Sequence, residues 1–132
     1  MATFASADEV YDQLGRVFRE LVADEELGPQ VQGADTVLQL RLTDPEATIT
    51  VSAKAGQERA VDTGETQHEP EVVLAMAADV AHQFFLGELN LTIALARGEI
   101  LAKGPVRKIL EVVPVVRPIF PRYKAQLEGA AA

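Results

Sequence analysis

The side chains that carry out chemistry in proteins are few and scattered in this 132-residue chain. The two histidines, His68 and His82, stand alone, and neither has a second histidine three or four residues away to complete a metal site. The two serines, Ser6 and Ser52, lie outside any Gly-x-Ser-x-Gly motif. The chain has no cysteine, which excludes disulfides, thiolate metal sites and cysteine nucleophiles. We therefore expect no nucleophilic catalysis and no metal centre.

The carboxylates and glycines give no stronger indication of catalysis. Asp44 and Glu46 flank Pro45 in an expected tight turn, and an exposed turn suits neither a general acid nor a general base. Gly98 and Gly104 flank a short predicted strand and do not follow a phosphate-binding fingerprint. An enzyme acting on small apolar substrates is disfavoured, because no titratable cluster is visible. We expect a protein that is not an enzyme and has no cofactor.

The second half of the chain contains many apolar side chains, interrupted by glycine and proline. Short helices broken by these residues pack less regularly than long ones, so an apolar cavity can persist between them and a sheet. Small-molecule sites are mostly concave and apolar. The alternative is that these side chains simply form the core. The residues expected to bind a lipid are Val80, Phe84, Leu89, Ile93, Ile100, Ile109, Val113, Val116, Ile119 and Phe120.

Charge is distributed unevenly along the chain. Residues 1–89 contain 17 acidic and 5 basic side chains, whereas residues 90–132 contain 3 acidic and 7 basic ones. The basic residues form either a solvated rim or a face for acidic head groups, and Arg97, Lys103 and Arg107 are the candidates for contact with a head group. The overall charge of −8 argues against nucleic acid as a partner.

No targeting or membrane-spanning segment is expected. The first nine residues lack a basic region followed by an apolar one. The aliphatic stretch 72–78 is far shorter than the roughly 20 residues that span a bilayer. The C-terminal triple alanine is not a peroxisomal tripeptide. These features predict a cytoplasmic protein with no transmembrane segment, and they leave open a transient contact with a membrane surface.

Periodicity predicts an α+β fold in a single domain covering residues 1–132, with frayed ends at 1–5 and 128–132. Apolar residues at helical spacing follow the capping-box sequence of residues 6–9, and Gly28-Pro29 is expected to end this first helix. Period-two alternation predicts strands near 37–42, 48–54, 59–63, 72–76 and 99–103. Short helices are predicted after residue 77, after Asn90 and after Pro105. The three prolines between 114 and 121 are expected to prevent a continuous helix, with a last short helix at 123–127.

The order of these elements and the placement of the glycines resemble the sterol carrier protein type 2 family over residues 36–123. The resemblance is most specific in EVVLAMAAD at 71–79, FFLG at 84–87 and ARGEILAKG at 96–104. It implies a five-stranded, mainly antiparallel sheet covered by helices on one face, with a hydrophobic tunnel between them. It also implies that the tunnel holds a fatty acid, an acyl-CoA, a sterol or another lipid.

Two functional hypotheses follow. The first is non-catalytic binding or carriage of one apolar ligand between the sheet and the C-terminal helices. The second is an accessory or protein-interaction module on the same fold with a closed cavity, in which the acidic first half meets an unknown protein partner. Whether the interior is open distinguishes the two.

Overall fold

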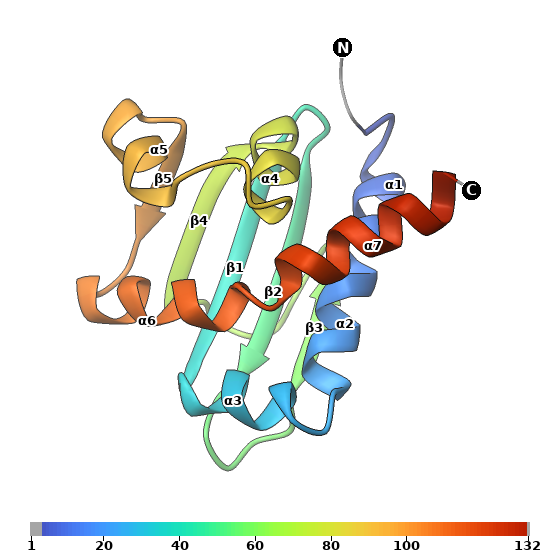
Figure 1. Cartoon of the computed structure of the whole chain (residues 1–132). Coiled ribbons are helices and arrows are strands. Elements are labelled where there is room, and N and C mark those ends of the chain that lie inside the picture. The colour runs from blue at the N-terminus through green and yellow to red at the C-terminus, as the bar shows by residue number, and fades with distance from the viewer. Residues whose placement is uncertain (1–3, 132) are drawn as a thin grey trace.

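The computed structural model of the chain describes residues 4–131. Its centre is a five-stranded sheet with the strand order β3-β2-β1-β4-β5 (Figure 1). Strand β1 pairs in parallel with β4, and the other three neighbouring pairs are antiparallel. The predicted α+β class and mainly antiparallel sheet are confirmed. The strands are β1 Thr36–Thr43, β2 Ala47–Ala53, β3 Ala60–Thr63, β4 Val72–Ala77 and β5 Ile100–Lys103.

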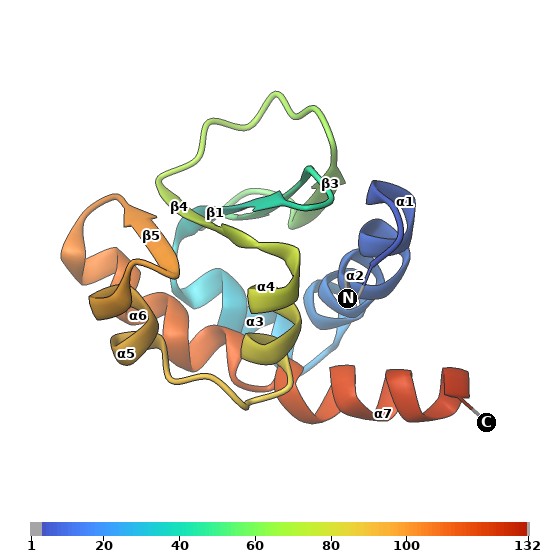
Figure 2. The same ribbon diagram turned by 90° about the horizontal axis from the view of Figure 1, so that it is seen from above.

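Helices cover one face of this sheet, whereas the loop between β3 and β4 arches over the other face (Figure 2). The N-terminal helical stretch consists of α1, a π-helical segment at Tyr11–Gly15 and α2. None of the helices between residues 4 and 131 combines the length and the apolar character that a membrane crossing requires. The α-helices are α1 Ala7–Val10, α2 Arg16–Ala23, α3 Leu27–Gly33, α4 Ala78–Phe85, α5 Leu91–Arg97, α6 Val106–Val116 and α7 Ile119–Ala131.

The alternation in β1 determines which side chains face the helices. Leu38, Leu40 and Leu42 are buried in the core beneath the helices, because successive side chains of a strand point to opposite faces. Gln39 lies on the other face, where its amide donates a 3.0 Å hydrogen bond to Thr50 of β2. Gln39 and Thr50 are both buried, and this hydrogen bond gives each of them a partner on the face that the β3–β4 loop covers (Figure 2).

The helix ends use the capping residues that the sequence indicates. The hydroxyl of Ser6 accepts a hydrogen bond from the Glu9 backbone N–H at 3.3 Å, and Asn90 accepts one from Ile93 at 3.1 Å. Gly98 ends α5 with φ of +75°, a conformation that suits glycine because it has no Cβ. These local signals therefore fix the start of α1 and both ends of α5.

The prediction that the first helix ends at Gly28-Pro29 is wrong. The first helical stretch ends at Ala23, and Gly28 and Pro29 lie inside α3. Pro29 is the third residue of that helix. A proline is tolerated there, because the backbone N–H groups of the first turn have no partner within the helix.

The proline-rich segment also differs from the prediction. Helix α6 continues through Pro114 to Val116, and the helical conformation is interrupted only at residues 117–118. Helix α7 then starts at Ile119, four residues before the expected start. Pro114 removes one N–H donor but leaves the rest of the α6 ladder, and the buried Val112 and Val116 hold the helix on the core.

The ends for which the sequence predicts fraying lie partly outside the described residues. Residues 1–3 and 132 are not described, and α7 runs to Ala131.

Candidate functional site

A groove of about 510 Å³ opens beside α4, α5, α6 and the first turn of α7. This volume lies within the roughly 300–1,000 Å³ of typical small-molecule sites. Most of the lining side chains are apolar, and charged groups occur only at Glu88 and Arg117. We call it the α4–α6 groove. It is lined by Phe84, Gly87, Glu88, Leu89, Asn90, Leu91, Thr92, Leu95, Ile109, Leu110, Val113, Arg117 and Phe120.

Helix periodicity explains how α5 and α6 contribute to this groove. Leu91 and Leu95 are four residues apart on α5, and Ile109 and Val113 are four apart on α6. Residues at that spacing share one helix face. Arg117, directly after α6, continues the same spacing and places a cation at the end of this apolar row.

Two aromatic rings close the groove where α4 meets α7. The rings of Phe84 and Phe120 meet edge to face, with centroids 5.5 Å apart. Gly87 lies beside them with φ of +79°, and a Cβ at this position would lie 3.5 Å from the Phe120 ring. The glycine thus allows the tight turn after α4 that brings the α4–α5 connection against Phe120.

The structure brings together five of the ten residues that the sequence predicted to bind a lipid. They come from α4, the α4–α5 connection, α6 and α7, and they converge on the α4–α6 groove although they span 37 positions of the chain. These residues are Phe84, Leu89, Ile109, Val113 and Phe120.

The other five predicted residues lie elsewhere. Ile100 and Ile119 are buried in the core at 1% and 0% exposure, and Val80 packs against that core while partly exposed. Val116 faces the interior behind α6. Ile93 is 49% exposed on α5 and does not line the groove.

None of the three basic residues predicted to receive a head group lines the groove. Arg97 lies 3.9 Å from Glu99, and Arg107 lies 4.0 Å from Glu111. Both arginine side chains are largely exposed, as is Lys103. The cation that does line the groove is Arg117.

Sequence reasoning missed Arg117, Leu91, Leu95 and Leu110 as lining residues. A signal for Arg117 exists, since it follows Ile109 and Val113 at helical spacing. That signal was hidden by the expectation that the prolines interrupt the helix. Leu110 shares the same helix and is 67% exposed at the edge of the groove.

The expected tunnel between the sheet and the helices is not visible in the described part of the chain. Behind α6 lies a small space of about 20 Å³, which we call the Thr36 chamber. A second pocket of about 130 Å³, the outer pocket, adjoins it and shares Leu21, Val31 and Val115 with it. The chamber is lined by Phe18, Leu21, Val31, Ala34, Thr36, Leu38, Val51, Ala53, Val112, Val115 and Val116.

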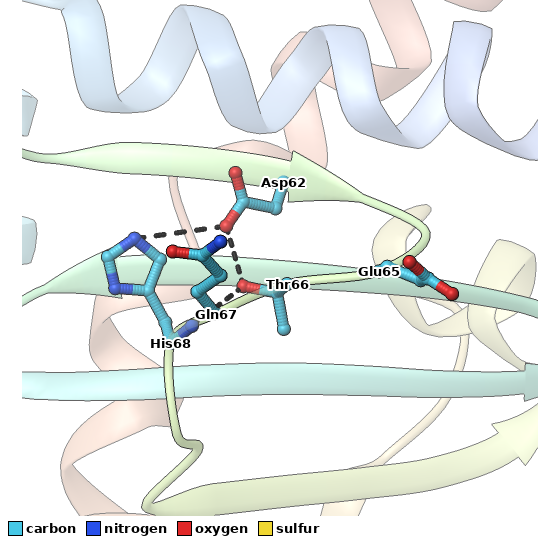
Figure 3. Close-up of a pocket in the computed structure, with 5 residues that line it drawn as sticks. All are labelled: Asp62, Glu65, Thr66, Gln67 and His68. Carbon is cyan, nitrogen blue, oxygen red and sulfur yellow. Dashed lines mark hydrogen bonds and ion pairs between the residues drawn. The ribbon is translucent and has the colours of Figure 1, made fainter.

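A polar hollow of about 430 Å³ lies at the β3–β4 loop (Figure 3). Asp62 accepts a 2.6 Å hydrogen bond from the Thr66 hydroxyl, which in turn accepts one from the backbone N–H of His68 at 3.1 Å. The His68 ring lies 3.8 Å from Asp62, and Figure 3 shows Glu65 directed away from both. Within residues 4–131, no three histidine or carboxylate side chains converge as metal ligands. The polar side chains of this hollow interact with one another and stabilise the loop. The apolar groove is therefore the better candidate site.

Comparison with protein families gives a match to the model of the SCP-2 sterol transfer family over residues 14–117. The matched region includes the sheet, α4, α5 and α6. No curated protein sequence matches the chain significantly.

Solved structures share this fold at low sequence identity. Sterol carrier protein 2 from Yarrowia lipolytica, in its apo form, superimposes with a TM-score of 0.70 at 14% identity, covering 88% of this chain and 94% of that one. The palmitated SCP2L2 of Aedes aegypti gives a TM-score of 0.60 at 20% identity, covering 81% and 93%. The sec-alkylsulfatase Pisa1 from Pseudomonas sp. gives 0.53 at 19% identity, covering 63% of this chain but 13% of the enzyme.

Proposed function

Because the chain belongs to the SCP-2 sterol transfer family, we propose that it binds an apolar lipid in the α4–α6 groove, without catalysis. The observation that carries this proposal is the groove itself, which has ligand-sized volume, apolar walls from four segments and a cation at one end. A single-chain amphiphile fits this chemistry, with its chain along Leu91, Leu95 and Ile109 and its acidic end near Arg117.

Apolar burial supplies the binding free energy in this proposal. Each methylene removed from water contributes about 0.8 kcal/mol, so affinity rises severalfold with each carbon until the groove is full. Aliphatic walls discriminate weakly between similar apolar ligands. We therefore propose that the protein binds lipids with an acyl or alkyl chain as a class and does not select one sterol or one chain length.

The polar groups of the groove support binding more than reaction chemistry. The side-chain oxygen of Asn90 is used to cap α5, and Arg117 and Glu88 offer charge but form no nucleophile–base pair with each other. We propose that bound lipid leaves the groove chemically unchanged.

The interaction module with a closed cavity remains the competing function. It is favoured by one observation, the small size of the space behind α6, which measures only about 20 Å³. Under that function the acidic first half of the chain would meet a protein partner, and the α4–α6 groove would bind no lipid saturably.

The test begins with native mass spectrometry of the protein purified from cells, followed by titration with a fluorescent fatty acid. Palmitate is the first competitor, because one relative with this fold is palmitated. Saturable one-to-one binding that palmitate displaces supports the proposal, provided that the bound fatty acid is recovered chemically unmodified. The absence of both co-purified lipid and saturable binding would overturn it.

A matched pair of variants on α6 locates the site. Leu110 and Val106 are both highly exposed, at 67% and 72%, but only Leu110 lines the groove. Leu110→Glu is expected to weaken fatty acid binding at least tenfold, because a carboxylate replaces an apolar wall. Val106→Glu is expected to bind as the parent does. Equal effects of the two substitutions would place the ligand outside the groove.

A further inference from the structure

Strand β5 forms one edge of the sheet, and within residues 4–131 it pairs with β4 alone (Figure 1). In an antiparallel pair, successive residues direct their backbone N–H and C=O groups alternately toward the partner strand and away from it. Every second residue of β5 therefore directs these groups away from the sheet. No turn, loop or cap bond between backbone groups of the described residues involves Ile100–Lys103. This edge can accept a further strand.

The opposite edge of the sheet, strand β3, is covered. Helix α2 packs against β3, and Arg19 of that helix donates a 3.4 Å hydrogen bond to the Thr63 hydroxyl. In β5, by contrast, the side chains of Leu101 and Lys103 are exposed. An exposed strand edge is a template for pairing with another chain, so β5 is the edge of this sheet at which such pairing is expected.

Exposed apolar side chains gather around β5. Within residues 4–131, the four large apolar side chains that are exposed all belong to α5, β5 and α6, and of these only Leu110 lines the α4–α6 groove. The other three are Ile93 at 49%, Leu101 at 61% and Val106 at 72% exposure. Leu101 lies on β5 itself, Val106 begins α6 shortly after β5 ends, and α5 packs against β5. Lipid binding in the groove does not account for this apolar surface.

The charge around β5 is positive in a protein whose net charge is −8. Residues 97–107 contain three basic side chains and one acidic one. The acidic one, Glu99, pairs with Arg97 at 3.9 Å, whereas no ion pair of the described residues includes Lys103. A lysine on an edge strand opposes pairing with a second copy of the same edge. The same charge favours a segment that carries carboxylates.

Exposed apolar and basic side chains would also suit a membrane surface. However, hydrocarbon cannot pair the N–H and C=O groups of an open strand edge, and open edges therefore do not occur within the lipid. An extended peptide pairs all of these groups through one ladder of backbone bonds. The unpaired edge of β5 thus favours a peptide over a membrane.

We propose that the free edge of β5 binds an extended acidic segment of another protein, which adds a sixth strand to the sheet. The backbone of the segment continues the hydrogen-bond ladder, and its alternate side chains lie on opposite faces. Carboxylates on one face lie beside Lys103, and apolar side chains on the other face point to the helix layer that carries Ile93 and Val106. This surface is separate from the α4–α6 groove, so the interaction requires no bound lipid.

The experiment uses a synthetic hexapeptide that alternates glutamate and valine, with both ends blocked, and isotope-labelled protein observed by NMR. The readout is amide hydrogen exchange in β5, because strand addition protects backbone N–H groups and loose electrostatic contact does not. In the free protein, alternate amides of Ile100–Lys103 should exchange much faster than the others. Saturating peptide should slow the exchange of these fast amides about tenfold or more.

A matched pair of lysine variants tests the role of charge. Lys103→Glu should weaken peptide binding about tenfold, because it places like charges side by side. Lys124 is also exposed, on α7, and Lys124→Glu changes the net charge equally but should bind the peptide as the parent does.

Two further peptides separate side-chain charge from the backbone ladder. A hexapeptide that alternates lysine and valine should bind the parent about tenfold more weakly than the glutamate peptide. The glutamate peptide with every backbone N–H methylated keeps its side chains but should protect no β5 amide.

Several results would overturn the proposal. They are the absence of saturable peptide binding, binding that leaves the β5 amides unprotected, and equal weakening by Lys103→Glu and Lys124→Glu. Protection of the same amides by raised protein concentration alone would assign the edge to a second copy of the chain. Binding to vesicles of phosphatidylcholine and phosphatidylserine in a four-to-one ratio that depends on Lys103, without peptide binding, would assign the surface to a membrane.

One comparison separates this proposal from lipid binding in the groove. Leu110→Glu should weaken fatty acid binding and leave peptide binding intact. Lys103→Glu should do the opposite, since Lys103 does not line the groove. Each of the two proposals can therefore fail without the other.

Discussion

The Nδ1 atom of His82 and the phenol oxygen of Tyr123 lie 2.8 Å apart. This contact joins α4 to α7, the helices that supply Phe84 and Phe120 to the groove. Tyr123 is fully buried, and burial raises the pKa of its hydroxyl. The rings of Phe4 and His82 also meet edge to face, with centroids 5.8 Å apart. The histidine that looks isolated in the sequence therefore links the two helices.

This link predicts a loss of stability as the pH falls. Burial lowers the pKa of His82 below its ordinary 6.5, and the negative charges of Glu88 and Asp79 offset only part of that effect. The unfolded chain therefore takes up a proton at a higher pH than the folded chain does. The resulting stability is fully present above pH 6.5 and declines as the pH falls toward the folded pKa.

Denaturation by urea at pH steps from 7.5 to 5 measures this decline. His82→Gln keeps an amide able to bond Tyr123 and removes the titration, so its stability should fall less steeply over this range than that of the parent. His68→Gln serves as the comparison for the other histidine. Parallel curves for His82→Gln and the parent would show that His82 does not cause the decline.

The contacts of Asp24, including its ion pair with Arg122, predict a second loss of stability at acidic pH. The Asp24 carboxylate accepts hydrogen bonds from the backbone N–H groups of Leu27 at 2.8 Å and Glu26 at 2.9 Å, and from Arg122 at 2.6 Å. These three hydrogen bonds lower the pKa of the Asp24 carboxyl below its ordinary 3.8. The bond from Leu27 has the largest effect, followed by those from Arg122 and Glu26. Its stabilising effect is present above pH 3.8 and is lost as the pH falls through the folded pKa.

Two variants separate the two roles of this carboxylate. Asp24→Ala removes the bonds to the start of α3 and to α7 together, whereas Arg122→Gln removes only the contact to α7. At pH 7 the first is expected to lower Tm more than the second, and both differences from the parent should shrink as the pH is lowered further below 3.8. An Arg122→Gln loss as large as that of Asp24→Ala would contradict the predicted role of Asp24 at the start of α3.

Arg117 is expected to recognise the acidic end of the ligand. It lines the groove, and Arg107 does not. Exposed charge pairs contribute roughly 0.2–1 kcal/mol, so Arg117→Gln should weaken the binding of a fatty acid about 1.4- to fivefold and leave that of the corresponding fatty alcohol unchanged. Arg107→Gln should alter neither affinity. A larger effect of Arg107→Gln in the same titrations would assign the head group to the residues that the sequence favoured.

The two glycines around β5 are expected to tolerate alanine differently. A Cβ on Gly104, where φ is +131°, would lie 2.4 Å from the Glu71 carbonyl oxygen, whereas one on Gly98 meets no atom within 4 Å. Gly98→Ala should cost about 1–2 kcal/mol, the penalty of a left-handed residue alone. Gly104→Ala should cost clearly more, because β4 must also move. Similar free energies of unfolding for the two variants would contradict this close approach.

Local patterns determined most of the fold. The alternation of Leu38, Leu40 and Leu42 fixes one buried face of β1, and Ser6 and Asn90 cap helices through bonds that span three residues. Such features depend on near neighbours in the chain, so the sequence alone predicts them. Pro29 and Pro114 were misread, because whether a proline ends a helix depends on its place in the helix and on the packing around it.

The candidate site was only half predictable. Periodicity placed Ile109 and Val113 on one face of a helix, but it could not show that this face meets Leu91 and Leu95 of α5. Likewise the residue types of β5 give no sign that this strand ends the sheet with a free edge. These facts depend on contacts between segments distant in the chain, and only the tertiary structure decides those.

The sequence by itself determined the succession of the five strands, the buried face of β1 and the resemblance to a lipid-binding family, because hydrophobic period and capping act over a few residues. The tertiary structure decided that a groove of about 510 Å³ lies on one side of α6 and a space of only about 20 Å³ on the other. The volume left between elements depends on how closely their side chains pack, and no local pattern specifies that distance.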